Sequence, residues 1–135
     1  MNIEFSFIII DDSELDCYVT QKFLERSAKD LAIQTFQNAQ NALEIIREST
    51  AGNNLVPTII LLDLQMPFMN GVDFIEEFEK FPAEVQKNYR ITILTVLTPA
   101  NNPADIYRIR TYKTVNNIIE KPLTKEKLIP LLIQA

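Results

Sequence analysis

The sequence predicts an α/β fold in which helices cover both faces of one parallel sheet. Short apolar runs rich in β-branched residues alternate five times with stretches of helical periodicity, which is the element order of repeated βαβ units. Several runs are apolar at successive positions, as is typical of strands buried on both faces. The 135 residues, 47% of them hydrophobic, are enough for one domain with a single core.

The five strands are predicted from their apolar runs and from the turn residues between them. They cover residues 5–10, 32–36, 58–62, 91–97 and 115–119. The segment "FPAEVQKNYR" lengthens the connection to the fourth strand, and we expect it to lie on the surface, where insertions are tolerated.

The first two helices follow the first two strands. Ser13 followed three residues later by Asp16 is a capping-box pattern, so the first helix begins directly behind the pair "DD". Apolar residues then recur on one face of this helix at Leu15, Val19 and Phe23. The stripe of the second helix is made of Ala39, Ala42, Leu43 and Ile46.

The last three helices are predicted from apolar residues and end signals. The third carries Phe74, Ile75 and Phe78 after Gly71. In the fourth, Asn102 suits the N-cap, Pro103 the first turn and Asp105 the positive end of the helix dipole. Thr124 can cap the fifth helix, and its core-facing residues are Leu128, Leu131 and Leu132.

Right-handed crossovers between five strands allow few arrangements, and the common one at this length is the flavodoxin-like sheet order 2-1-3-4-5. We therefore predict a three-layer α/β/α, doubly wound (βα)5 fold. In this order the first and third strands are neighbours. Ligands of such sheets bind outside the carboxyl ends of the strands at the switch point, so the residues that end these two strands are candidates for a site.

Three carboxylates end the first and third strands. Asp11 and Asp12 follow the first strand, and Asp63 in "LLDLQMPFMNG" ends the third. Like charges repel, so the cluster costs stability unless a cation occupies it. Magnesium prefers oxygen ligands and binds through a few carboxylates together with phosphate oxygens. An aspartate beside it can act as a nucleophile toward a phosphoryl donor, while a hydroxyl and an ammonium hold the phosphoryl oxygens.

Four motifs together resemble the receiver domain of two-component response regulators. They are "IIIDDS", "LLDLQMPFMNG", the threonine after "TVL" and "IIEKPL", and they extend over essentially the whole chain. The resemblance implies that Asp63 is the phosphoacceptor and that Lys121 pairs with the phosphoryl group. It also implies a Mg²⁺ site formed by Asp11, Asp12, Asp63 and the backbone carbonyl of Gln65.

The hydroxyl group has two candidates in "ILTVLTPANNPAD", Thr95 and Thr98. They are three residues apart, so on a strand they point to opposite faces. Thr98 has the spacing to Lys121 that receivers with this kind of fourth helix show, whereas Thr95 would leave an overlong loop. We prefer Thr98 and keep Thr95 as the alternative.

Receivers usually carry Tyr or Phe three residues before the lysine, and here that position is Ile118. Ile is stiff at its first torsion and has no ring to swing. Coupling is therefore expected to run through Thr98 and the fourth helix. The output face that the resemblance implies includes Tyr107, Arg108, Arg110 and Tyr112.

The resemblance implies a protein that accepts phosphate from a histidine kinase or a histidine phosphotransfer protein. It would then signal through changed contacts with a downstream protein, and no enzymatic activity beyond self-phosphorylation and self-dephosphorylation is expected. The chain ends directly after the fifth helix, so we expect residues 1–135 to be a single receiver domain with no output domain.

Two other functions remain open. One is a receiver-like binding module that is never phosphorylated, although the complete set of acids and the lysine argues against it. The other is a magnesium-dependent phosphatase with an aspartate nucleophile. Such phosphatases carry a second acid two residues after the nucleophile, where this chain has Gln65.

Charge and composition exclude several classes of partner. The formal net charge of −5 argues against nucleic acid or an anionic membrane as the main partner. The apolar runs are too short to span a membrane. Cys17 is the single cysteine and cannot form a disulfide within the chain, and no secretory leader is evident, so we expect a cytoplasmic protein.

Overall fold

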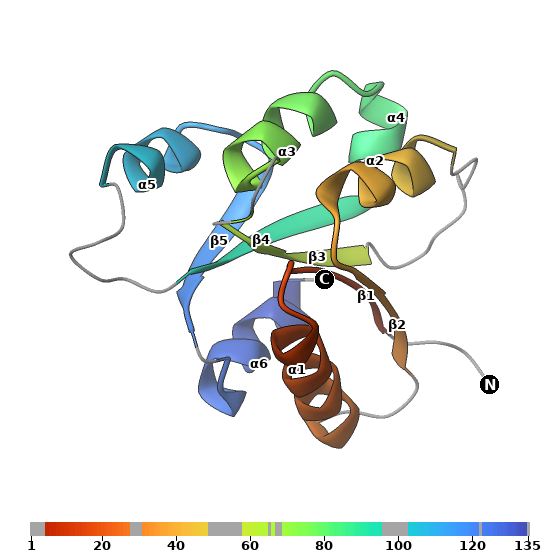
Figure 1. Ribbon diagram of the computed structural model, residues 1–135, viewed down its shortest axis with the longest axis vertical. Helices are drawn as coiled ribbons and strands as arrows, with labels where there is room; N and C mark the ends of the chain where they lie inside the picture. The colour runs from red at the N-terminus through yellow and green to blue at the C-terminus, as the bar shows by residue number, and fades with distance from the viewer. Residues whose placement is uncertain are drawn as a thin grey trace.

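The computed structural model has a five-stranded parallel sheet between two layers of helices (Figure 1). The structure describes residues 5–27, 31–48, 58–64, 66, 69–95, 103–121 and 123–134. Helices α2, α3, α4 and α5 cover one face of the sheet, and α1 and α6 cover the other (Figure 1). The predicted three-layer fold is confirmed.

The strand order is β2-β1-β3-β4-β5, and all four pairings are parallel, as the sequence predicts. The bounds are β1 Phe5–Ile10, β2 Leu31–Phe36, β3 Thr58–Asp63, β4 Tyr89–Thr95 and β5 Val115–Glu120. Strand β4 begins two residues before the predicted start. It ends at Thr95, and the last two residues of the predicted strand lie outside the described part of the chain.

Six helices are present among the described residues, one more than predicted. Their bounds are α1 Glu14–Ser27, α2 Ala39–Glu48, α3 Gly71–Phe78, α4 Ala83–Gln86, α5 Pro103–Arg110 and α6 Lys125–Gln134. The additional helix, α4, is a single turn in which the N–H groups of Val85 and Gln86 both donate to the Pro82 carbonyl. One turn is too short to show a periodic pattern. None of the helices in the described ranges is long and apolar enough to cross a membrane.

The apolar stripes predicted for three helices are buried. The four stripe residues of α2 and the three of α3 belong to the core between the sheet and α2, α3 and α5. Leu128 and Leu131 of α6 belong to a second core on the opposite face, with Leu132 packed against it. Thr124 caps α6 as predicted, because its hydroxyl accepts from the Lys127 N–H at 3.3 Å.

Two of the three residues in the stripe predicted for α1 are exposed. Leu15 and Val19 are 68% and 55% exposed, and Phe23 is partly buried against the core, whereas Cys17 and Leu24 are buried. Two residues along a helix correspond to a rotation of about 200°, so the face with Cys17 lies nearly opposite Leu15. Periodicity identified the helix, but its apolar residues lie on more than one face and the core takes only one of them.

The pairing register brings the strand ends together. Ile10 of β1 lies beside Leu62 of β3, so the next residues, Asp11 and Asp63, extend neighbouring strands. On the far side, Thr95 of β4 lies beside Glu120 of β5, and Lys121 follows directly. Residues far apart in the chain therefore meet at one edge of the sheet.

Candidate functional site

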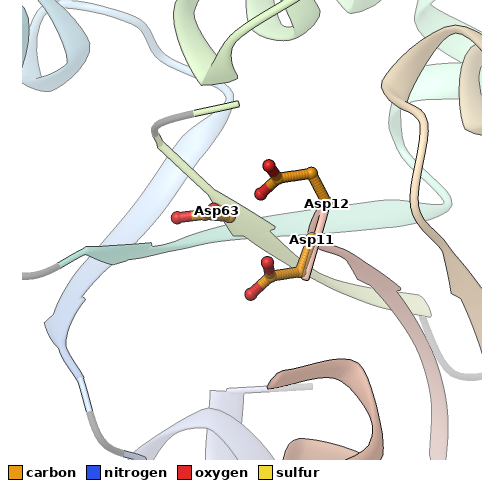
Figure 2. A group of neighbouring side chains, drawn as sticks. All are labelled: Asp11, Asp12 and Asp63. Carbon is orange, nitrogen blue, oxygen red and sulfur yellow. The ribbon is translucent and has the colours of Figure 1, made fainter. Parts of the chain in front are cut away.

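Three carboxylates converge at the carboxyl ends of β1 and β3. Carboxylate oxygens of Asp11, Asp12 and Asp63 lie within 4.8 Å of one another, and the side chains point beyond the strand ends (Figure 2). Asp11 and Asp63 are only 4% and 8% exposed, whereas Asp12 is exposed. The predicted cluster therefore has two sheltered carboxylates and one that faces solvent.

A tight turn positions Asp11 at the start of α1. The Asp11 N–H donates to the Phe36 carbonyl of β2, and the Asp11 carboxylate accepts from the Ser13 N–H, both at 3.0 Å. The Ser13 hydroxyl in turn accepts from the Asp16 N–H at 3.1 Å. Ser13 thus caps the helix as predicted, but its own N–H pairs with Asp11, whereas a capping box would pair it with Asp16.

The end of β3 is fixed by the close approach of α3. The Gly71 N–H donates to the Leu64 carbonyl at 2.9 Å. A Cβ at Gly71 would lie 3.0 Å from the Leu64 Cα and 3.2 Å from the Asp63 carbonyl oxygen, both of them backbone atoms. Asn70 and Asp73 form a complete capping box at the start of α3. Glycine is therefore required if the helix is to begin directly against the strand that carries Asp63.

Lys121 is the cation of the site. Its ammonium lies 3.1 Å from Asp11 and 3.4 Å from each of Asp16 and Asp63. Its backbone N–H donates to the Thr95 carbonyl at 2.7 Å, which anchors the residue to the end of β4. Burial alone would lower the pKa of Lys121, but the charges of the neighbouring carboxylates, Asp63 first, raise it above its ordinary value. Lys121 is therefore a permanent cation at neutral pH.

Asp16 is a member of the site that the sequence reasoning missed. It was interpreted as a capping residue, yet its carboxylate lies beside Lys121. The available signal was its place in the first turn of α1, directly behind the "DD" pair, where a side chain can reach the rim of the sheet. Its distance of 105 residues from Lys121 in the chain hid the pairing.

Of the two candidate hydroxyls, Thr95 lies in the described part of the chain and Thr98 lies outside it, as does Gln65. Thr95 ends β4 and is 2% exposed. Because side chains alternate along a strand, Thr95 shares a face with Ile93, which pairs in register with Ile118. The alternative candidate therefore lies on the α5 side of the sheet, on the same face as Ile118.

Cys17 lies close to the site, but its thiol is expected to be unreactive. Its thiol lies 3.3 Å from the Asp11 carbonyl oxygen, within hydrogen-bonding reach. Burial, reinforced by the charges of Asp11 and Asp16, raises the pKa of the Cys17 thiol to about 11. The thiolate is therefore scarce at neutral pH.

The face predicted for output is only partly free. Tyr107 of α5 is exposed, but Arg108 forms an ion pair with Glu76 of α3 at 2.8 Å. Tyr112 packs against the core. Tyr107 and Arg110 are the two of the four predicted contact residues that are exposed without an ion pair among the described residues.

The donor set fits a hard cation. All three clustered ligands are carboxylates, and oxygen donors of this kind suit Mg²⁺ and related ions. Two of the acids are sheltered and share one ammonium, so a divalent cation would offset the remaining negative charge. The fold and this site together define a doubly wound α/β protein with an acidic rim at its switch point, where the three carboxylates could hold a metal ion.

The comparisons with known proteins agree with that class. The family model described as the response regulator receiver domain matches residues 7–133, so the chain belongs to the response regulator receiver domain family. A response regulator receiver protein from Dyadobacter fermentans is 30% identical, superposes with a TM-score of 0.83, and is covered over 96% of each chain.

One further solved structure and two curated proteins are more distantly similar. A two-component response regulator from Cytophaga hutchinsonii, 22% identical with both chains fully covered, superposes with a TM-score of 0.81. The probable methanogenesis regulatory protein FilR2 of Methanothrix harundinacea is 23% identical over 92% of this chain and 76% of its own length. For a protein-glutamate methylesterase of Bacillus licheniformis, 29% identical over 87% of this chain, the match spans 34% of its length.

Proposed function

We propose that the chain accepts a phosphoryl group on Asp63 from a histidine kinase or a histidine phosphotransfer protein, and that the phosphorylated form signals through changed protein contacts. The observation that carries the proposal is the placement of Asp63. It is sheltered at a strand end, within 4.8 Å of two further carboxylates and 3.4 Å from the Lys121 ammonium. Family membership and the fold support the same assignment.

In the proposed reaction, a carboxylate oxygen of Asp63 attacks the phosphorus of a phosphohistidine. A P–O bond forms and the P–N bond breaks, which gives an aspartyl phosphate and returns the electron pair to the imidazole, which takes up a proton. Lys121 stays charged beside Asp63 and pairs with the added phosphoryl oxygens. Asp11 and Asp12, with Asp63 and the carbonyl of Gln65, would hold Mg²⁺, which neutralises charge on the phosphoryl oxygens.

The hydroxyl proposed to contact the phosphoryl group belongs either to Thr98 or to Thr95. The spacing argument favours Thr98, whereas the position of Thr95 at the end of β4, one residue beyond the register partner of Asp63, favours Thr95. Alanine and serine substitutions compared at each position distinguish them, because only the relevant position should lose function with Ala and keep it with Ser.

The exposed stripe of α1 supports a docking place for the phosphoryl donor. Leu15, Tyr18 and Val19 are large, exposed and apolar, and they lie on the helix that begins directly behind Asp12. A donor histidine must come within bonding distance of Asp63, so its protein has to cover this rim. The downstream target is assigned to the α5 side, where Tyr107 is exposed. A cytoplasmic setting suits a chain whose single cysteine is buried and unpaired.

Incubation with Mg²⁺ and acetyl phosphate, followed by intact mass measurement, tests the proposal. One phosphoryl group is expected, and Asp63→Asn should prevent its addition because an amide is a poor nucleophile. Glu44→Gln, which changes an exposed acid of α2, is the control and should label normally. Undiminished labelling of Asp63→Asn would overturn the assignment. Steady turnover of an external phosphate ester would favour a phosphatase, and no labelling by any donor would favour a binding module.

A further inference from the structure

A second polar site lies at the opposite end of the sheet from the carboxylates. A cavity of about 480 Å³ opens at the amino ends of β4 and β5, and its lining includes three cations, Lys87, Arg90 and Lys113. Cavities that bind small molecules commonly span about 300 to 1,000 Å³. No acid lines the cavity among the described residues, although Glu79 borders it by accepting a hydrogen bond from Thr114.

The three cations have no ion-pair partner within the described part of the chain. Every ion pair recorded there involves another cation, such as Lys121 or Arg108. Three unpaired cations around one cavity show that charge is unevenly distributed in a chain whose net charge is −5. The cavity is therefore a local positive region that attracts anions.

Two of the polar groups are held in place before any ligand arrives. Nη1 of Arg90 donates to the carbonyls of Lys87 and Tyr89, at 3.3 and 3.1 Å. No acceptor is recorded among the described residues for its other N–H groups. The side-chain oxygen of Asn116 accepts from the Ile91 N–H at 3.3 Å, which leaves the Asn116 amide NH₂ to donate elsewhere.

An aromatic wall completes the cavity. The ring of Tyr89 packs edge-on against Phe78, with ring centroids 6.0 Å apart and an interplanar angle of 90°. Both residues line the cavity. Tyr89 and Arg90 are successive residues of β4, so their side chains leave the strand on opposite faces and line the cavity from two sides. The ring offers a surface for a planar group, and the guanidinium offers a fork of donors for a phosphate.

We propose that this cavity binds a small organic phosphate with a planar ring. The phosphate would pair with Arg90 and the flexible lysines, Lys87 and Lys113, and the ring would lie against Tyr89. Tyr89 pairs in register with Thr58, five residues before Asp63 on β3, which is about 16 Å along the strand. The ligand therefore cannot touch the phosphoacceptor, and this site stands independently of the proposed phosphotransfer.

Adenosine 5′-phosphate serves as the probe, titrated into the ¹⁵N-labelled chain in buffer freed of divalent metal. Saturable shifts are expected at Tyr89, Arg90, Ile91 and the Asn116 side-chain amide, with weaker shifts from inorganic phosphate or uncharged adenosine. Arg90→Gln and, separately, Lys113→Gln should each weaken binding by about tenfold. Lys22→Gln on α1 is the matched control and should leave binding unchanged.

Three outcomes would overturn the proposal: no saturable shifts, equal shifts at exposed cations elsewhere such as Arg47, or binding unchanged by Arg90→Gln and Lys113→Gln. Binding of an acidic peptide without binding of the nucleotide would assign the cavity to a protein partner and also overturn it. The same titration with Asp63→Asn separates the two sites, because loss of the phosphoacceptor should not change binding here.

Discussion

The two ends of the sheet carry opposite charge and differ in how far that charge is paired within the protein. At the carboxyl end, Lys121 pairs with three carboxylates, and a fourth, that of Asp12, lies beside two of them. At the amino end of β4 and β5, three cations line a cavity and pair with no acid among the described residues. At the acidic end, part of the negative charge is neutralised by an ion pair within the protein, whereas at the basic end the cations are available to solvent or a ligand. The length of the strands separates the two charged regions.

The largest expected effect falls on the exposed acid of the carboxyl end. Asp12→Ala should weaken Mg²⁺ binding by roughly tenfold or more and block labelling by acetyl phosphate, because it removes a charged oxygen donor from the proposed Mg²⁺ site. In metal-free buffer the variant should be slightly more stable, by up to about 0.5 kcal/mol, since repulsion is relieved. Calorimetric Mg²⁺ titration and urea unfolding measure the two effects, and labelling that needs no Mg²⁺ would contradict this account.

Removing one cation from each end of the sheet tests the difference in ion pairing between the two ends. Lys121→Ala leaves the sheltered carboxylates without their partner, so we expect a loss of about 2 kcal/mol in the free energy of unfolding without metal. Mg²⁺ should recover part of that loss. Lys113→Ala, at the basic end, should change stability by less than about 0.5 kcal/mol. Equal losses in urea unfolding would remove the distinction between the two ends.

Lys121→Ala should also separate labelling from its consequence. Some labelling by acetyl phosphate is expected to remain, because Asp63 keeps its nucleophilic oxygen. Any change in partner affinity on phosphorylation should disappear, since Lys121 is the residue proposed to pair with the added phosphoryl group. A variant that labels and still changes its partner affinity normally would show that the lysine has no such role.

Strand β5 connects the two ends, and Ile118 lies midway along it. Ile118→Ala should cost about 1.5 kcal/mol in urea unfolding, because the side chain packs on the core while partly exposed. Its effect on signalling should be smaller. Beryllofluoride, a phosphate mimic, should shift the backbone resonances of residues 98–106 more than those of Ile118. A rotamer change at Ile118 while residues 98–106 stay still would show the reverse.

The smallest expected effect concerns Asp16. Asp16→Asn removes a half-exposed partner of Lys121, so the loss of unfolding free energy should be about 0.5 kcal/mol. Glu25→Gln, which removes an exposed partner of Lys22 on the same helix, is the matched control. A loss above that of Lys121→Ala would show that Asp16 has a further role.

The sequence was sufficient where local pattern and topology agree. A buried apolar run predicted β3, and the capping residue Thr124 predicted the start of α6. The parallel strand order then predicted that Asp11 lies beside Asp63. It was insufficient where tertiary packing decides. The stripe of Leu15 and Val19 is helical but exposed, since α1 buries its other face. The contact of Asp16 with Lys121 joins residues 105 positions apart, which no local pattern reveals.

Identification of the phosphorylated residue tests the central claim most directly. Borohydride reduces an acyl phosphate to an alcohol and releases phosphate, so a phosphorylated aspartate becomes homoserine. Trypsin should separate the candidates, because Asp63 lies in the peptide of residues 48–80 and both Asp11 and Asp12 lie in residues 1–22. After labelling and reduction, tandem mass spectrometry should find homoserine at position 63. Homoserine at position 11, 12 or 73, with Asp63 unchanged, would contradict the account.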